Sequence, residues 1–198
     1  AQALGSALGW HAAYVLVACI GIATATSLWF LLPHMTEMPA TSVRTELGAF
    51  KRSQVWLTLA MGTVGFGGMF AIYTYISWTM TTHAGMDPSS MWIVLMAYGI
   101  GNVAGAYFGG VLSDRSLEKG ILFSLVMIAV SLVCFYFTSS SAVLGTINFG
   151  VVGFFGSSLT PTLQVRLMHV AGDAQTLAAA LNHLSLIHIS EPTRLLSI

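Results

Sequence analysis

The chain has 198 residues, of which 56% are hydrophobic and only 7% are charged. Soluble domains carry roughly 25% charged residues, so this composition indicates an integral membrane protein. The formal net charge is zero, which gives no support to nucleic-acid binding. Cys19 and Cys134 lie in apolar runs without a CxxC pair or a Cys/His cluster, so the sequence predicts neither a disulfide nor a metal site.

Five apolar runs are long enough to cross a bilayer as helices, since about twenty helical residues span a hydrocarbon core of about 30 Å. The sequence predicts these spans at approximately 12–32, 55–80, 90–112, 120–138 and 142–163. A sixth helix is expected to begin near Ala174, with Asp173 as its N-cap, and to be incomplete. Because the runs lack the alternation of a membrane barrel, we expect an all-α membrane protein, a transmembrane helix bundle. Ala1 is not an initiator methionine, so we expect the chain to begin within a longer protein.

The basic residues fall in alternate connections between the predicted spans. The connections after the first, third and fifth spans carry Arg44, Lys51, Arg52, Arg115, Lys119 and Arg166. The connections 81–89 and 139–141 contain no Lys or Arg. The positive-inside rule therefore predicts that the basic connections are cytoplasmic. In one of the outer connections, Asp87 precedes Pro88 and is predicted to cap the third helix.

Small residues recur at every fourth position of the third span. They are Ala97, Gly101, Gly105 and Gly109. Residues at this spacing share one side of a helix and let a second helix backbone approach closely. Two interpretations stay open at this point: tight static packing, or a smooth surface along which the helices slide during function.

Polar and aromatic residues at membrane depth are the candidates for contact with a bound solute. They are Tyr73, Tyr75 and Trp78 in the second span, Asn102 in the third and Asn148 in the fifth. Each aromatic residue is equally well explained as an interfacial anchor. Each asparagine is equally well explained by a hydrogen bond between helices. The five predicted spans contain no Asp, Glu, Lys or Arg, so a proton-carrying group is expected elsewhere in the parent protein.

The stretch GGVLSDR, residues 109–115, resembles the loop motif of the major facilitator superfamily, in its second-half copy. The positions that carry over are Gly110, Asp114 and Arg115. In that family the charges of the motif belong to a cytoplasmic network that favours one closed state and breaks during transport. The resemblance therefore implies a conformational gating role. The sequence departs from the family pattern at Leu117, where glycine is usual, and at Glu118, where a basic residue is common.

Two further stretches resemble drug and sugar efflux members of the same superfamily. Residues 8–33 are similar to the entry and the sixth helix, and residues 178–183, AAALNH, to the start of the eleventh. The resemblance implies a partial major facilitator fold. Residues 1–33 are then the end of the N-terminal half, 34–53 the cytoplasmic connection between halves, and 54–183 a partial C-terminal six-helix bundle.

The tail LSLIHISEPTR, residues 184–194, brings Glu191, Pro192 and Arg194 into what would be a membrane span. Such residues are costly in lipid. The segment resembles the translation of a transposase adapter used in sequencing libraries. We therefore expect residues 184–198 to be a non-native tail.

The resemblance implies a secondary transporter of the bacterial inner membrane that works by alternating access. Proton-coupled efflux of a small neutral or amphipathic solute, a drug or a sugar, is the expected activity, with no cofactor. The expected partners are that solute, protons, the lipid bilayer and the missing N-terminal half. Two alternatives stay open: an uptake permease of the same superfamily, and a structural or signalling membrane subunit. No Ser/His, paired Asp or His/Glu constellation lies at membrane depth, so an enzyme is not expected.

Overall fold

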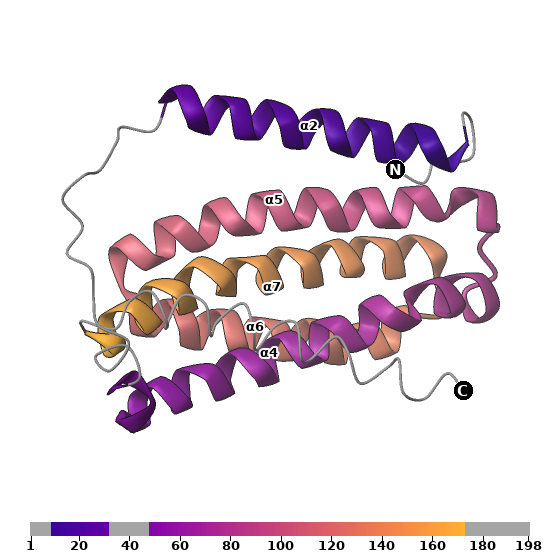
Figure 1. Ribbon diagram of the computed structural model, residues 1–198. Helices are drawn as coiled ribbons and strands as arrows, with labels where there is room; N and C mark the ends of the chain where they lie inside the picture. Colours follow the sequence, from indigo (N-terminus) through magenta and orange to yellow (C-terminus); the bar gives the residue numbers. More distant parts are fainter. Residues whose placement is uncertain (1–8, 32–47, 173–198) are drawn as a thin grey trace, which may run out of the picture. The chain divides into compact units, whose positions relative to one another are not determined.

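The computed structural model describes residues 9–31 and 48–172 of the chain (Figure 1). Every regular element within these ranges is helical, and five helices are long and apolar enough to cross a membrane. The predicted all-α, membrane-spanning fold class is therefore confirmed. The expected sixth helix near Ala174, residues 178–183 and the tail 184–198 lie outside the described residues.

The chain divides into two compact units, residues 1–40 and 41–198. The described part of the first unit is helix α2, Trp10–Leu31. Its hydroxyl groups at Thr24, Thr26 and Ser27 each donate to the carbonyl four residues earlier, at 2.7–2.9 Å. Because these three hydroxyl groups are satisfied within the helix, they do not prevent its contact with lipid.

The described part of the second unit, residues 48–172, contains four long helices that run alternately up and down (Figure 1). They are α4 (Ser53–Trp78), α5 (Met91–Arg115), α6 (Leu117–Thr138) and α7 (Ala142–Ala171). A short 3₁₀ helix, η1 (Gly48–Lys51), precedes α4, and a π-helix, η2 (Thr79–His83), continues it. The 3₁₀ turn η3 (Pro88–Ser90) leads into α5. The predicted Asp87 cap is confirmed at this turn: its carboxylate accepts the Ser89 N–H at 2.8 Å, which lowers the pKa of the carboxyl.

The helices extend beyond the predicted spans, which corrects the predicted ends. Helix α7 continues to Ala171 rather than ending near residue 163, so Arg166 is helical. Helix α5 ends at Arg115 and α6 begins at Leu117, so one residue connects them instead of a loop of about six. A 30-residue helix is about 45 Å long, whereas the hydrocarbon core is about 30 Å thick. Hydropathy detects only the part of a helix that lies inside the hydrocarbon core. The charged turns at the helix ends are therefore left out of the predicted spans.

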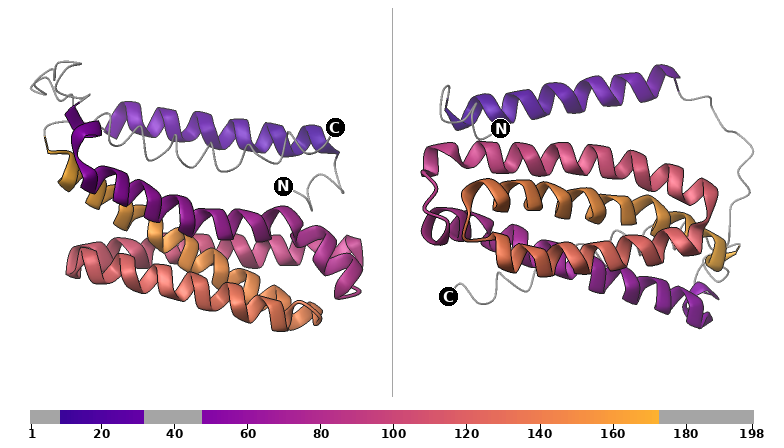
Figure 2. Two further views of the ribbon diagram at one scale, coloured as in Figure 1. Left: turned by 90° about the horizontal axis from the view of Figure 1, so that it is seen from below. Right: turned by 180° about the vertical axis from the view of Figure 1, so that it is seen from behind.

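Helix α7 lies at the centre of the bundle, between α5 on one side and α4 and α6 on the other (Figure 1; Figure 2, right). Three buried apolar clusters join it to its neighbours. The middle cluster includes Phe66, Ile128 and Leu159, and a second includes Ile76, Tyr98 and Phe149. The third, Val55, Leu167 and Ala171, joins the first turn of α4 to the last turn of α7.

Candidate functional site

The motif residues Gly110, Asp114 and Arg115 lie in the last turns of α5, at the end of the bundle where α4 and α6 begin and α7 ends (Figure 1). We call this end, which carries Arg52, Arg115, Lys119 and Arg166, the basic end. Asp114 and Arg115 are exposed and form no hydrogen bond or ion pair with any residue that the structure describes. Both belong to a helix and not to a loop, because α5 runs three residues beyond the predicted end at residue 112 and reaches Arg115 before the turn at Ser116.

The small-residue side of α5 faces α7. A Cβ atom added at Gly105 would overlap the Phe154 carbonyl oxygen and lie 2.7 Å from that carbonyl carbon. At Gly109, the added atom would lie 2.7 Å from the Cα of Ser158. Gly101 faces Gly150 in the same way, and a Cβ at Gly150 would in turn lie 3.2 Å from the carbonyl oxygen of Ala97. All four residues with the predicted spacing therefore lie at the contact between α5 and α7.

An aromatic group joins α4, α5 and α7. The ring of Tyr98 stacks on that of Phe149 with centroids 4.5 Å apart, and Tyr73 packs 5.3 Å from Tyr98 and 6.3 Å from Phe149. Phe149 is fully buried and Tyr98 is 9% exposed, whereas Tyr73 is 44% exposed. Tyr73 therefore forms the accessible edge of a buried aromatic stack.

A polar pair lies beside this stack, near the midpoints of α5 and α7. The hydroxyl of Ser157 donates to Oδ1 of Asn102 at 2.7 Å, and Asn102 lies one turn along α5 from Tyr98. Pro161 lacks an N–H group and so cannot donate to the Ser157 carbonyl four residues earlier. Together the stack and the pair place an aromatic face, an amide and a hydroxyl next to each other. We call Tyr73, Tyr98, Phe149, Asn102 and Ser157 the aromatic–amide cluster.

The other candidates of the sequence analysis lie outside this cluster. Tyr75 and Trp78 are 63% and 64% exposed, on sides of α4 away from the stack. Asn148 is buried and lies 3.1 Å from the Thr138 hydroxyl of α6. With its amide turned over, which satisfies both ends, the nitrogen donates to the Ser131 carbonyl at 3.2 Å and the oxygen accepts from the Thr138 hydroxyl. This geometry favours a helix–helix bond for Asn148. Tyr98 and Ser157, conversely, were missed by sequence reasoning, because a Tyr and a Ser are common at such positions and only their contact with Asn102 marks them.

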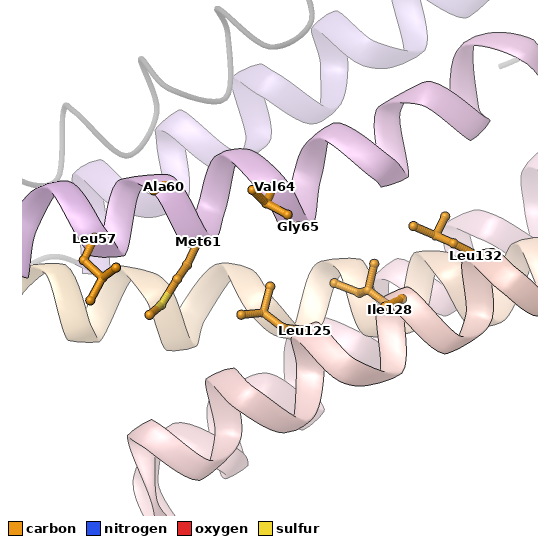
Figure 3. Close-up of a pocket in the computed structure, with 9 residues that line it drawn as sticks. Leu57, Ala60, Met61, Val64, Gly65, Leu125, Ile128 and Leu132 are labelled. Atoms are coloured by element: carbon orange, nitrogen blue, oxygen red, sulfur yellow. The ribbon is translucent and has the colours of Figure 1, made fainter.

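The surface of the described bundle includes a larger and a smaller groove. The larger, of about 430 Å³, lies between α4 and α6 (Figure 3). It is lined by Leu57, Ala60, Met61, Val64, Gly65, Leu125, Ile128, Ala129 and Leu132. A smaller groove of about 290 Å³ between α6 and α7 includes Asn148. The larger groove offers no side-chain hydrogen-bonding group, so the aromatic–amide cluster is the better candidate for selective contact with a solute.

Within residues 9–31 and 48–172, no group of three His, Cys, Asp or Glu side chains is arranged to hold a metal ion. No strongly polar catalytic constellation accompanies the cluster in these ranges: its members are an amide, a hydroxyl, two phenols and a phenyl ring. The cluster can therefore bind and orient a solute by stacking and hydrogen bonding.

The family model described as Major Facilitator Superfamily matches residues 1–187. The chain is 31% identical over 182 residues to the "Inner membrane transport protein YdhP" of Escherichia coli, covering 90% of this chain and 46% of that protein. It is 26% identical over 182 residues to the "Uncharacterized MFS-type transporter YfhI" of Bacillus subtilis, covering 90% and 45%. A "Probable sugar efflux transporter" of Pasteurella multocida is 26% identical over 181 residues, with 90% and 44% covered. The chain thus spans just under half the length of these relatives. No solved structure gives a significant match.

Proposed function

The chain belongs to the major facilitator superfamily, and on that premise we propose that it forms part of a secondary transporter that exports a small neutral or amphipathic solute by alternating access. In such transporters the solute binds near the bilayer midplane between two helical halves, which rock around it. The four-helix bundle would then supply one wall of the site. This assignment also proposes that residues 1–33 end the first half, 34–53 connect the halves, and 54–183 belong to the second.

The observation that carries the proposal is the aromatic–amide cluster. Asn102 and Ser157 lie near the midpoints of α5 and α7, which is the depth at which a midplane site is built. Tyr73 offers a partly exposed ring that packs on Tyr98, one turn from Asn102 on α5. An aromatic face that adjoins an amide and a hydroxyl suits a solute with a planar or apolar surface and a few hydroxyl or carbonyl groups. Drugs and sugars both have these features.

The absence of charge in the cluster supports the preference for neutral or amphipathic solutes. Its five members include no Asp, Glu, His, Lys or Arg, so a strongly anionic solute would lack a counter-charge there. We propose proton coupling through an acidic residue in the first half, because no Asp or Glu of the described helices lies at membrane depth.

The motif residues Gly110, Asp114 and Arg115 are proposed to act in conformational gating, as the family resemblance implies. Asp114 and Arg115 are exposed at the basic end and unpaired with any part of the bundle that the structure describes. They are therefore accessible to a partner in the other half. The basic end is proposed to face the cytoplasm of a bacterial inner membrane, in agreement with the charge distribution.

An accumulation assay tests this function. The full-length protein that contains this chain would be expressed in bacteria that lack their own exporters and are loaded with neutral amphipathic dyes and sugars. We expect lower accumulation, abolished by a protonophore. Tyr73→Ala and Asn102→Ala should each reduce export roughly five- to tenfold, since losing one hydrogen bond or one stacking contact costs about 1–1.5 kcal/mol.

Tyr107→Ala is the matched control, since Tyr107 is 79% exposed on the same helix as Asn102 and lies outside the cluster. Export should persist in this variant. Raised instead of lowered accumulation would indicate an uptake permease. No change in accumulation of any tested solute, in a protein that is stably inserted, would favour a structural or signalling subunit and contradict the proposal.

A further inference from the structure

The first turn of α4 and the last turn of α7 meet at the basic end around a dry apolar plug. The plug consists of Val55 and Leu167, both 0% exposed, and Ala171, 1% exposed. Leu59 and Val170 pack against it. Since these residues lie at a helix end where lipid headgroups and water begin, full burial there requires that the two helix ends stay together.

An arginine at the start of α4 reaches across to the end of α7. Nη1 of Arg52 donates to the carbonyl oxygen of Val170 at 3.0 Å. The last carbonyls of a helix have no partner in the helix and carry partial negative charge, so a guanidinium there is favourable. Gly172 allows this approach: it has φ +62°, and a Cβ at this position would lie 2.8 Å from Nη1 of Arg52.

A second arginine reaches in the opposite direction, from α7 to the other two helices. Nη1 of Arg166 lies 3.3 Å from Oε1 of Glu118 on α6, and its Nη2 donates to Oε1 of Gln54 on α4 at 3.5 Å. The Arg166 side chain is 17% exposed, so the guanidinium is held between the helices rather than in water. The two arginines therefore bridge the same helix ends, one from α4 to α7 and the other from α7 to α4 and α6.

We propose that Arg52 and Arg166, together with the plug, form a clasp that closes the basic end of the α4–α7 contact to water. Arg52 ties α4 to the last carbonyls of α7, and Arg166 ties α7 back to α4 and to α6. The motif charges Asp114 and Arg115 take no part in it, because they form no bond with the described bundle. The clasp thus lies within one helix bundle and is distinct from a gate between two halves. The proposal does not depend on the proposed transport activity.

The clasp predicts how fast a buried cysteine just inside it reacts with a water-soluble reagent. Thr58 is 2% exposed and lies one turn beyond Val55. In the 198-residue chain with Cys19→Ser and Cys134→Ser, Thr58→Cys would be labelled by a cationic methanethiosulfonate reagent. We expect Arg52→Ala and Arg166→Ala each to raise the rate roughly two- to fivefold, because each bridge has a solvent-exposed partner and is of modest strength.

Two controls separate local opening from general loosening. Lys51→Ala and Lys119→Ala remove neighbouring exposed cations that take no part in the clasp, and should leave the rate unchanged. A cysteine at Ile76, 3% exposed near the opposite end of α4, should label at the same rate in every variant. Acceleration at Thr58→Cys alone supports the clasp. Equal acceleration at both sites, or the same effect from Lys119→Ala, overturns it.

Three variants that change the surroundings of the two arginines provide a second test if Arg166→Ala fails to fold. Gln54→Ala and Glu118→Ala each delete one contact of Arg166 and leave its charge in place. Gly172→Ala places a methyl group against the Arg52 guanidinium. All three should accelerate labelling at Thr58→Cys. Unchanged rates in these variants and in Arg52→Ala would show that the plug excludes water without the arginines.

Discussion

At Gly105 the backbones of α5 and α7 touch without any side chain between them. The nearest atoms to an added Cβ belong to the carbonyl group and Cα of Phe154, which cannot move away as a flexible side chain would. Gly99 and Gly110 on the same helix have nothing within 4 Å of such an atom. Glycine is therefore required at particular positions of α5 by its contact with α7, and at others it is not.

This difference gives a prediction for single methyl groups. Gly105→Ala should lower the free energy of unfolding by about 1–3 kcal/mol, the usual cost of overpacking, and Gly105→Leu by more. Gly99→Ala should be neutral or stabilising by up to about 1 kcal/mol, because alanine is the better helix former. Thermal unfolding of the purified chain in detergent, followed by circular dichroism, measures both. Equal stability of Gly105→Ala and Gly99→Ala would mean that the two helices do not approach as described.

Among the elements, α7 is the central helix, since it contacts each of the other three long helices described in its unit, α4, α5 and α6. Its buried hydroxyl groups are satisfied locally or across a helix contact: Ser158 shares a hydrogen bond of 2.9 Å with Ser124 of α6. Such pairing avoids the cost of an unsatisfied polar group in an apolar interior. Hydrogen bonds and small residues thus stabilise these helix contacts, whereas large apolar side chains stabilise the core of a soluble protein.

The alternating direction of the helices predicts the labelling of introduced cysteines. Ser116, in the single-residue connection between α5 and α6, and Ala84, after η2, lie at opposite ends of the bundle. With the basic end in the cytoplasm, Ser116→Cys and Thr45→Cys should react with a membrane-impermeant maleimide only from the cytoplasmic side, and Ala84→Cys only from outside. Labelling of intact cells and of inverted vesicles measures this. Reaction of Ser116→Cys in intact cells would reverse the proposed orientation.

For the whole molecule, the chain covers under half the length of its relatives, 46% in the case of YdhP. The aromatic–amide cluster belongs entirely to the second of its two compact units. A cluster on one bundle can contact one side of a solute. Enclosing the solute requires a second bundle on the other side.

We therefore expect no solute flux from this 198-residue chain alone. Purified chain reconstituted in liposomes should give the same dye and sugar flux as empty liposomes. Co-reconstitution with a polypeptide that supplies the first half should restore flux if the two bundles assemble. Flux from the chain alone, above that of a Tyr73→Ala control, would contradict this expectation.

The sequence alone determined the class of the molecule. Runs of apolar residues, the distribution of Lys and Arg and the GGVLSDR stretch were sufficient to predict five membrane helices and the superfamily, which the helices and the family match confirm. This works because lipid allows few backbone solutions, so length and hydropathy carry most of the information. The Asp87 cap was also predictable, because a helix cap depends on residues that are adjacent in the sequence. The gating motif, the domain boundaries and the non-native tail remain predictions.

The tertiary structure decided which residues meet. The sequence placed Tyr73, Tyr75 and Trp78 together as candidates, but only Tyr73 joins the stack, because a helix turns about 100° per residue and sends the other two elsewhere. The sequence made Asn102 and Asn148 equal candidates for solute contact. In the structure Asn102 bonds Ser157 near the midpoints of α5 and α7, whereas Asn148 bonds α6. The clasp likewise joins Arg52 to Val170, 118 residues apart. Hydropathy indicates which residues lie inside the membrane. Which side chains a residue contacts depends on how its helix packs against neighbouring helices. This packing is determined by side chains that are far away in the sequence.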